Sequence, residues 1–206
     1  MKRILFLSSL LFLASCARKS LPETSSTLVK NDCLSTLKPD FQSVLYSTQV
    51  YITSHYLSGL VVMKKMGGDT TRIVFTNEMG LTYFDFELTD QDFNVKYCIN
   101  KLNKKIVLNE LRDIFQLILM TDKRLDSFKE LKLDSLNQYC IDNSNEQICY
   151  YTDLNCTNIS MIETAKKQNK KVLISLEGLN KGLAKKIDIK YLNFKFNIIL
   201  NQSEGL

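Results

Sequence analysis

The sequence predicts a mainly β protein of the α+β class, in which a curved antiparallel sheet is combined with one or more helices. Three observations point to this class. Apolar and polar residues alternate along several short runs, as in strands with one buried face. Turn-forming residues separate these runs closely enough for hairpins. One stretch with helical periodicity, residues 106–118, lies between two groups of strands.

The composition of the chain is that of one globular domain. Its 206 residues are 45% hydrophobic and 24% charged. A chain of this length buries about 70% of its unfolded surface, and no repeat divides it, so we expect a single domain over residues 29–206. The net charge is only +5 and is spread along the chain, whereas nucleic-acid sites concentrate Lys and Arg on one face. We therefore expect no nucleic-acid partner.

The N-terminus has the features of a secretory signal. Lys2 and Arg3 precede an apolar run, residues 4–13, which only two serines interrupt. Ten helical residues rise about 15 Å, which is half the thickness of a bilayer core, so a permanent membrane span is disfavoured. We therefore predict a signal peptide over residues 1–15.

The signal ends in a sequence that resembles the lipobox of bacterial lipoproteins. Leu13, Ala14 and Ser15 supply an aliphatic residue and two small residues, and Cys16 follows them. The resemblance implies that Cys16 carries a diacylglyceryl thioether, that cleavage occurs before it, and that the new amino terminus is acylated. Several acyl chains such as palmitate hold a protein stably on a membrane, whereas one is marginal. The alternative is an ordinary signal peptide with a cysteine at its cleavage site.

A polar tether follows the anchor. Residues 16–28 begin with the lipidated Cys16, are rich in Ser and Thr, and show no apolar periodicity, as in a linker. Ala17 follows the cysteine directly, without the Asp that signals inner-membrane retention in many Gram-negative lipoproteins. By this resemblance, the expected location is the periplasmic face of the outer membrane.

The first part of the domain predicts an antiparallel meander. Residues 46–56 and 57–66 are β-rich and form two strands, or one long strand broken near Gly59. A Gly-Gly pair at 67–68 supplies a hairpin turn, because glycine takes positive φ at little cost. Residues 70–76 form the next strand.

The meander continues after a turn at residues 77–80. In residues 81–88, two phenylalanines alternate with two acidic residues, so one face of this strand is apolar and the other is wet. A second turn leads into another alternating run, residues 93–99.

The period of the apolar pattern changes after Asn103. Apolar residues then recur at spacings of three, four and seven, as on one face of a helix. Additional leucines widen this face, so we expect the helix to be buried on more than one side. The apolar positions are Ile106, Val107, Leu111, Ile114, Phe115 and Ile118.

The chain after the helix predicts a hairpin. Residues 123–136 mix charges with leucines and favour no single structure. Residues 138–141 and 147–151 are β-rich and flank a polar stretch at 142–145, which is typical of a turn.

The last part of the chain contains the longest β run. We expect a short connecting helix at residues 159–169 and a strand at 171–176. Residues 187–200 then form one strand, in which the apolar phase shifts at Tyr191 and Leu192. Such a shift requires a bulge or bend and is typical of a curved sheet.

The order of these features resembles the LolA/LolB-like half-barrel lipoproteins. A lipobox, a tether, a meander, a central apolar helix and a final meander follow in that layout, and residues 72–87 are similar to a group of Gram-negative lipoproteins with this expected fold. The resemblance implies a half-barrel closed by helices over an apolar cavity. It also implies binding of acyl chains or lipoproteins and a role in lipoprotein localisation. One departure is the absence of Trp.

Alternation predicts which side chains face the concave, apolar side of this sheet. Residues two apart on one strand share a face, so four pairs of apolar residues are expected to point to that side. If the sheet encloses a cavity, these side chains contact the acyl chain. They are Leu60, Val62, Ile73, Phe75, Phe84, Phe86, Phe194 and Phe196.

The turn at residues 77–80 presents Met79 at its tip. In the outer-membrane receptor that this fold resembles, a projecting loop in a comparable place carries a leucine that touches the membrane during lipoprotein delivery. The resemblance implies that Met79, together with Leu81, contacts the membrane. The alternative is that Met79 folds back over the rim of the sheet and fills a gap.

The sequence gives little support for an enzymatic activity. His55 is the one histidine and lies in a predicted strand, and no nucleophile elbow is present. Asp85 and Glu87 share one face, but their alternation with phenylalanine is typical of a solvated strand face. The Gly-Gly pair is too short for a phosphate loop. We therefore expect no enzymatic activity and no cofactor.

Five cysteines remain besides Cys16, and in an oxidising compartment they form disulfides. Their connectivity does not follow from the sequence. Cys140 and Cys149 are the expected pair, because they face each other if Ser144 and Asn145 form a two-residue turn. Buried reduced thiols are the alternative. With no C-x-x-C pair and no second histidine, we expect no metal site.

Two classes of function remain. The first is a module that binds or transfers acyl chains or lipoproteins in an apolar half-barrel. The second is a structural or interaction lipoprotein with a filled core and no ligand. Cavity-lining and core residues have the same composition, so only the resemblance favours the first class. The oligomeric state stays open.

Overall fold

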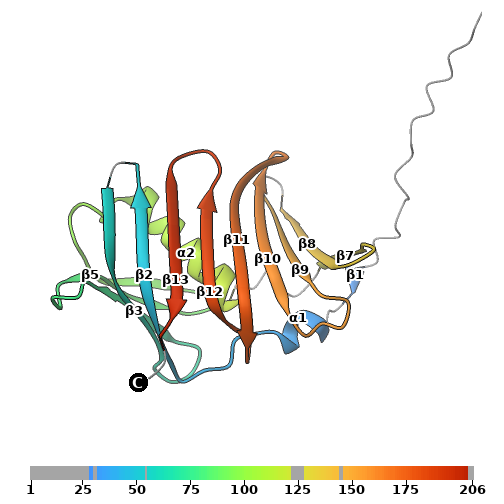
Figure 1. The fold of residues 1–206 in the computed structure, drawn as a ribbon, viewed down its shortest axis with the longest axis horizontal. Helices are drawn as coiled ribbons and strands as arrows, with labels where there is room; N and C mark the ends of the chain where they lie inside the picture. Colours follow the sequence, from blue (N-terminus) through green and yellow to red (C-terminus); the bar gives the residue numbers. More distant parts are fainter. Residues whose placement is uncertain (1–27, 30–31, 54, 122–127, 144–145, 204–206) are drawn as a thin grey trace, which may run out of the picture.

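The computed structural model describes residues 28–29, 32–53, 55–121, 128–143 and 146–203 of the chain. Within them, thirteen strands form one antiparallel sheet, accompanied by two helices (Figure 1). The predicted mainly β class is thereby confirmed. The predicted signal peptide, Cys16 and almost all of the tether lie outside the described residues.

The first meander has five strands, as the alternation predicts. The break between its first two strands lies at Thr53, whose φ is 51°, and not near Gly59. Gly59 lies within a strand, and the neighbouring strand approaches it so closely that an added Cβ would lie 1.9 Å from the carbonyl oxygen of Thr76, so this position requires glycine. The strands are β2 (Ser43–Ile52), β3 (His55–Lys65), β4 (Thr71–Thr76), β5 (Thr82–Leu88) and β6 (Phe93–Cys98).

Two predictions for the second meander are wrong. Residues 159–169 form a strand and a turn instead of a helix, because β10 pairs along both of its edges. Residues 187–200 are two strands joined by a turn, so the shift in phase marks a reversal of the chain and not a bulge. The strands are β7 (Phe128–Lys132), β8 (Asn137–Asn143), β9 (Glu146–Thr152), β10 (Ile159–Lys166), β11 (Asn169–Asn180), β12 (Leu183–Tyr191) and β13 (Phe196–Gln202).

The two meanders join into one sheet. Its order is β1-β7-β8-β9-β10-β11-β12-β13-β2-β3-β4-β5-β6, where β1 is the short strand Leu28–Val29. The junction is the pairing of β13 with β2, which runs from Phe196 opposite Ile52 to Gln202 opposite Tyr46. The last strand of the chain, β13, therefore lies in the middle of the sheet, where the second meander meets the first (Figure 1).

The predicted helix is α2 (Lys105–Leu119). It packs on one face of the sheet, which we call the inner face. The ring of Phe115 lies 6.2 Å from that of Phe84 on β5, and the hydroxyl of Tyr150 on β9 donates a hydrogen bond of 3.1 Å to the carbonyl oxygen of Leu117. Ile106 is an exception to the predicted apolar face, since it is exposed. Among the described residues, no helix has the length and apolar character needed to cross a membrane.

Two disulfides tie the second meander together. Cys140 and Cys149 are bonded, as predicted, with their Cα atoms 4.1 Å apart on the paired strands β8 and β9. Cys33, in the short helix α1 (Asp32–Thr36), is bonded to Cys156 in the loop between β9 and β10. Cys98 is a free, half-buried thiol, and its burial raises its pKa.

Candidate apolar binding site

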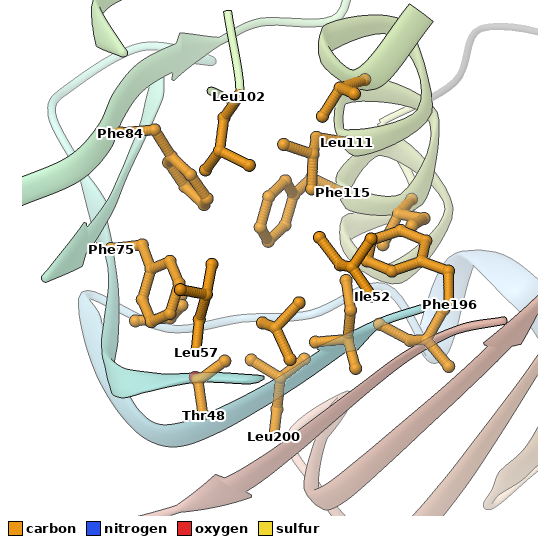
Figure 2. A pocket seen from close by; sticks show the side chains of 16 residues that line it. Thr48, Ile52, Leu57, Phe75, Phe84, Leu102, Leu111, Phe115, Phe196 and Leu200 are labelled. Atoms are coloured by element: carbon orange, nitrogen blue, oxygen red, sulfur yellow. The ribbon is translucent and has the colours of Figure 1, made fainter. Parts of the chain in front are cut away.

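An apolar space lies between α2 and the inner face of the sheet. It has a cavity volume of about 40 Å³. Figure 2 shows side chains from β3, β4, β5 and β13 pointing toward those of α2 across this space. We call it the cavity. It is lined by Thr48, Val50, Ile52, Leu57, Val61, Phe75, Phe84, Leu102, Val107, Leu111, Ile114, Phe115, Ile189, Phe196, Ile198 and Leu200.

Strand alternation places these side chains. On β2, every second residue is buried, so Thr48 and Val50 point to the inner face while their neighbours are more exposed. Phe75 on β4 lies directly opposite Phe84 on β5, with ring centroids 5.5 Å apart. Directly paired residues share a face and contact each other. The sheet therefore supplies a continuous apolar wall opposite Phe115 of α2.

The chemistry of the cavity is that of hydrocarbon. Thr48 is the one lining residue with a polar side chain, and its hydroxyl donates a hydrogen bond of 3.1 Å to the carbonyl oxygen of Tyr46. The cavity thus offers no free polar group to orient a polar substrate, and a cavity of this kind stays dry. Its lining therefore favours hydrocarbon groups over polar ones.

The size of the cavity limits what it holds in this state. A volume of about 40 Å³ exceeds the roughly 10–15 Å³ that one water needs. It is far below the roughly 300–1,000 Å³ of a typical ligand pocket. A ligand of ordinary size would therefore fit only if α2 and the sheet moved apart.

Polar contacts hold α2 to the sheet beside the cavity. The hydroxyl of Tyr191 on β12 donates a hydrogen bond of 3.0 Å to the carboxylate of Glu110, and the ammonium of Lys171 on β11 lies 2.8 Å from the same carboxylate. Burial, followed by the charge of Glu110, raises the pKa of Tyr191 above its ordinary value. The phenol therefore stays a donor at neutral pH.

Five of the eight predicted lining residues lie on the inner face. Phe75, Phe84 and Phe196 line the cavity itself. Ile73 and Phe86 are fully buried on the same face but lie outside the cavity lining. The strand pattern gave no sign that α2 also lines the cavity, although helical periodicity marks Val107, Leu111, Ile114 and Phe115 as apolar.

The prediction is wrong for the other three residues, which do not lie on the inner face. Leu60 and Val62 lie on the outer face, because β3 pairs Val61 with Phe75 and therefore turns Val61 inward. Both faces of this strand carry aliphatic residues, so alternation alone did not fix its phase. Phe194 lies in the turn between β12 and β13 and is 48% exposed, because the chain reverses there.

Met79 projects from the turn between β4 and β5. It is 92% exposed, so the alternative that it fills a gap at the rim is wrong, and Leu81 is also exposed. The turn is held by Asn77, whose Oδ1 accepts hydrogen bonds from the backbone N–H groups of Met79 at 3.0 Å and Leu81 at 2.8 Å. An apolar side chain is therefore presented to solvent on an ordered turn.

The polar residues considered for catalysis either face solvent or form ion pairs on the sheet. His55 is exposed at the start of β3. Asp85 forms a two-pronged ion pair with Arg72, and Glu87 lies 2.9 Å from Lys96. Within the described residues, no three His, Cys, Asp or Glu side chains cluster as a metal site requires.

Comparisons with known proteins identify the fold. No family model and no curated protein matches the sequence. A LolA superfamily protein from Nitrosomonas europaea superposes with a TM-score of 0.53 at 9% identity, covering 86% of this chain and 93% of that one. A domain from Vibrio parahaemolyticus, described as an outer membrane lipoprotein-sorting protein domain, superposes with a TM-score of 0.51 at 9% identity, covering 82% and 87%. The chain therefore shares its overall fold with these two proteins.

Proposed function

We propose that this protein is a lipid-anchored envelope lipoprotein that binds acyl chains, of lipids or of other lipoproteins, between its sheet and α2. The observation that carries the proposal is the cavity itself. Its lining is hydrocarbon apart from one internally bonded hydroxyl, and it lies between α2 and the inner face of the sheet. The shared fold with proteins described as LolA superfamily and lipoprotein-sorting supports the same function.

The energetics favour a carrier that shields an acyl chain. Each methylene moved from water into an apolar site contributes about 0.8 kcal/mol, so a chain of about fifteen methylenes gains on the order of 12 kcal/mol. The same chain moved from a bilayer gains little, because it is already in hydrocarbon. The protein therefore protects a chain from water during transfer, and a membrane is a ready source or destination.

The anchor and the disulfides support an envelope location. In this proposal, Cys16 carries the acyl groups that hold the protein on the periplasmic face of the outer membrane. Two disulfides among the described cysteines are typical of an oxidising compartment. Met79 and Leu81, exposed on their turn, touch the membrane during transfer, and no enzymatic step or cofactor takes part.

A second function is favoured by one observation. The cavity holds only about 40 Å³, which is what an almost completely filled core leaves behind. In that case the protein is a structural or interaction lipoprotein that holds a partner at the membrane and takes no ligand.

Native mass spectrometry separates the two functions. The Cys16→Ser chain, purified without lipid extraction, is expected to carry one noncovalent lipid or fatty acid that dissociates at higher collision energy. Incubation with palmitate is expected to convert any empty protein to the loaded form. A chain that stays empty at every palmitate concentration contradicts the binding function and favours the structural one.

A further inference from the structure

A second hollow lies at one end of the sheet, around the turn between β12 and β13. It is an open groove of about 590 Å³. Its walls include Tyr51 near the end of β2, Leu192 and Phe194 in the turn, and Phe196 at the start of β13. We call this end of the sheet the aromatic rim.

The aromatic rim exposes large apolar side chains that nothing in the described chain covers. Tyr51, Leu192 and Phe194 are each between 42% and 49% exposed, and Tyr56, whose ring lies 5.1 Å from that of Tyr51, is 53% exposed. Single exposed apolar residues are ordinary, whereas a contiguous group is typical of an interaction surface. Tyrosine and phenylalanine in such a group suit the boundary between water and hydrocarbon.

The charge of the aromatic rim is positive. Among the described residues that line the groove, Lys190 and Lys195 are the charged ones, and no carboxylate is present. Lys190 lies 3.2 Å from Asp188, while Lys195 is exposed and has no ion-pair partner in the described part of the chain. Lys167, in the neighbouring turn between β10 and β11, is also exposed. Exposed lysines among aromatic residues complement an anionic lipid surface.

One ring separates the groove from the cavity. Phe196 lines both of them, and it packs in a cluster of three rings, with centroids 4.8 Å from Tyr191 and 5.7 Å from Phe194. Tyr191 is also the residue that bonds to Glu110 of α2. The surface groove and the apolar interior are therefore neighbours across an aromatic wall, beside a contact that holds α2 in place.

We propose that the aromatic rim docks on an anionic lipid surface and that an acyl chain reaches the cavity there, past Phe196. The second half of this inference rests on the proposed function, whereas the docking itself does not. Tyr51 lies on the outer face of this end of the sheet and is exposed, whereas Phe196, on the inner face, is buried and borders the cavity.

The absence of tryptophan from the chain allows a direct test of docking. The Cys16→Ser background removes the covalent anchor, and Phe194→Trp then places a single indole at the rim. Leu154→Trp is the matched control, because Leu154 is at least as exposed as Phe194 but lies in the loop between β9 and β10, at the opposite end of the sheet. Vesicles of phosphatidylglycerol and phosphatidylethanolamine are compared with vesicles of phosphatidylcholine alone.

With the anionic vesicles, we expect a blue shift of the Phe194→Trp emission and quenching by brominated acyl chains, and neither effect for Leu154→Trp. Vesicle binding is expected to fall at least about fivefold in Lys195→Glu and to weaken with salt. Lys132→Glu, at the opposite end, is the charge control and should bind as the parent does. The proposal is overturned if Phe194→Trp and Leu154→Trp show equal emission shifts, or if Lys195→Glu and Lys132→Glu bind vesicles equally well. It is also overturned if the rim binds a soluble protein and no vesicles.

Palmitate added from solution distinguishes this inference from the proposed function. Lys195→Glu leaves the cavity intact, so it is expected to load palmitate normally while it loses vesicle binding and uptake from vesicles. If no variant loads palmitate but the rim still inserts into vesicles, the acyl-binding function fails and the docking surface stands. If palmitate loads and uptake from vesicles is unaffected by the rim, docking at the rim is wrong.

Discussion

The hydroxyl of Tyr191 on β12 donates a 3.0 Å hydrogen bond to the carboxylate of Glu110 on α2. This bond joins elements that lie on opposite sides of the same core, and it is reinforced by Lys171, 2.8 Å from the same carboxylate. It identifies a place at which the helix is attached to the sheet by polar contacts as well as by apolar packing.

Tyr191→Phe is expected to lower the free energy of unfolding by about 1–2 kcal/mol at pH 7, because a hydrogen bond to a charged group is lost. Burial and Glu110 raise the pKa of Tyr191 in the folded state. The unfolded chain therefore releases this proton first, and the contribution of Tyr191 to stability is present below about pH 10 and declines as pH rises above that value. Urea unfolding of both proteins from pH 7 to 11 is expected to show a shallower alkaline loss in the variant. Parallel curves would contradict this assignment.

Gly59→Ala is expected to be strongly destabilising. The added methyl would lie 1.9 Å from the carbonyl oxygen of Thr76, which is backbone and cannot rotate away, so we expect a loss of at least about 3 kcal/mol in unfolding free energy. Ser58→Ala, on the same strand, is the control and should change stability by less than about 1 kcal/mol. Thermal unfolding by circular dichroism measures both. Equal stability of the two variants would mean that β3 and β4 do not approach as closely as described.

Cys16→Ser is expected to release the protein from the membrane fraction, because the acyl chains attached at Cys16 supply the stable anchoring. Metabolic labelling with a radioactive fatty acid should mark only the parent chain. Cys98→Ser is the control, since Cys98 is a half-buried free thiol within the sheet. If the Cys16→Ser chain still sediments with membranes after a high-salt wash, the anchor assignment is wrong.

Met79→Glu is expected to leave stability within about 0.5 kcal/mol of the parent, because the side chain is 92% exposed. Acyl transfer to vesicles should nevertheless fall, since a charge is expelled from the membrane interface. Leu154→Glu, in an exposed loop at the other end of the sheet, should leave transfer unchanged. A stability loss above about 2 kcal/mol, or unchanged acyl transfer, would contradict a role of this turn in transfer to the membrane.

The sequence predicts most of this fold because alternation reports burial directly. Phe84 and Phe86 alternate with two acidic residues, and the strand lies as that pattern requires. The same rule fails on β3, where Leu60 and Val62 are as apolar as Val61 and Met63, and only pairing with β4 decides which set turns inward. Register is a long-range property that a single strand does not encode.

Other features depend on contacts between distant segments. Residues 159–166 carry helix-compatible residues, but pairing with β9 and β11 makes them a strand. The apolar alternation resumes soon after Tyr191 with only a shift in phase, so the sequence alone did not show that the chain reverses there and forms two strands. The cavity and the aromatic rim arise only when β2, β13 and α2 meet, so composition alone could not distinguish Phe196, which lines the cavity, from Phe86, which fills the core.

Photocrosslinking tests whether an acyl chain binds between the sheet and α2. The Cys16→Ser chain is loaded with palmitate that carries a diazirine near its methyl end, irradiated, digested and mapped by mass spectrometry. We expect adducts on Leu111 or Ile114 of α2 and on Ile198 or Leu200 of β13, all of which line the cavity, with competition by unlabelled palmitate.

The variant Leu57→Phe narrows the cavity, and Leu60→Phe adds the same bulk on the outer face of the same strand. We expect the first variant to lose most of the adduct and the second to keep it. Adducts confined to the outer face, or equal labelling of both variants, would contradict acyl binding between the sheet and α2.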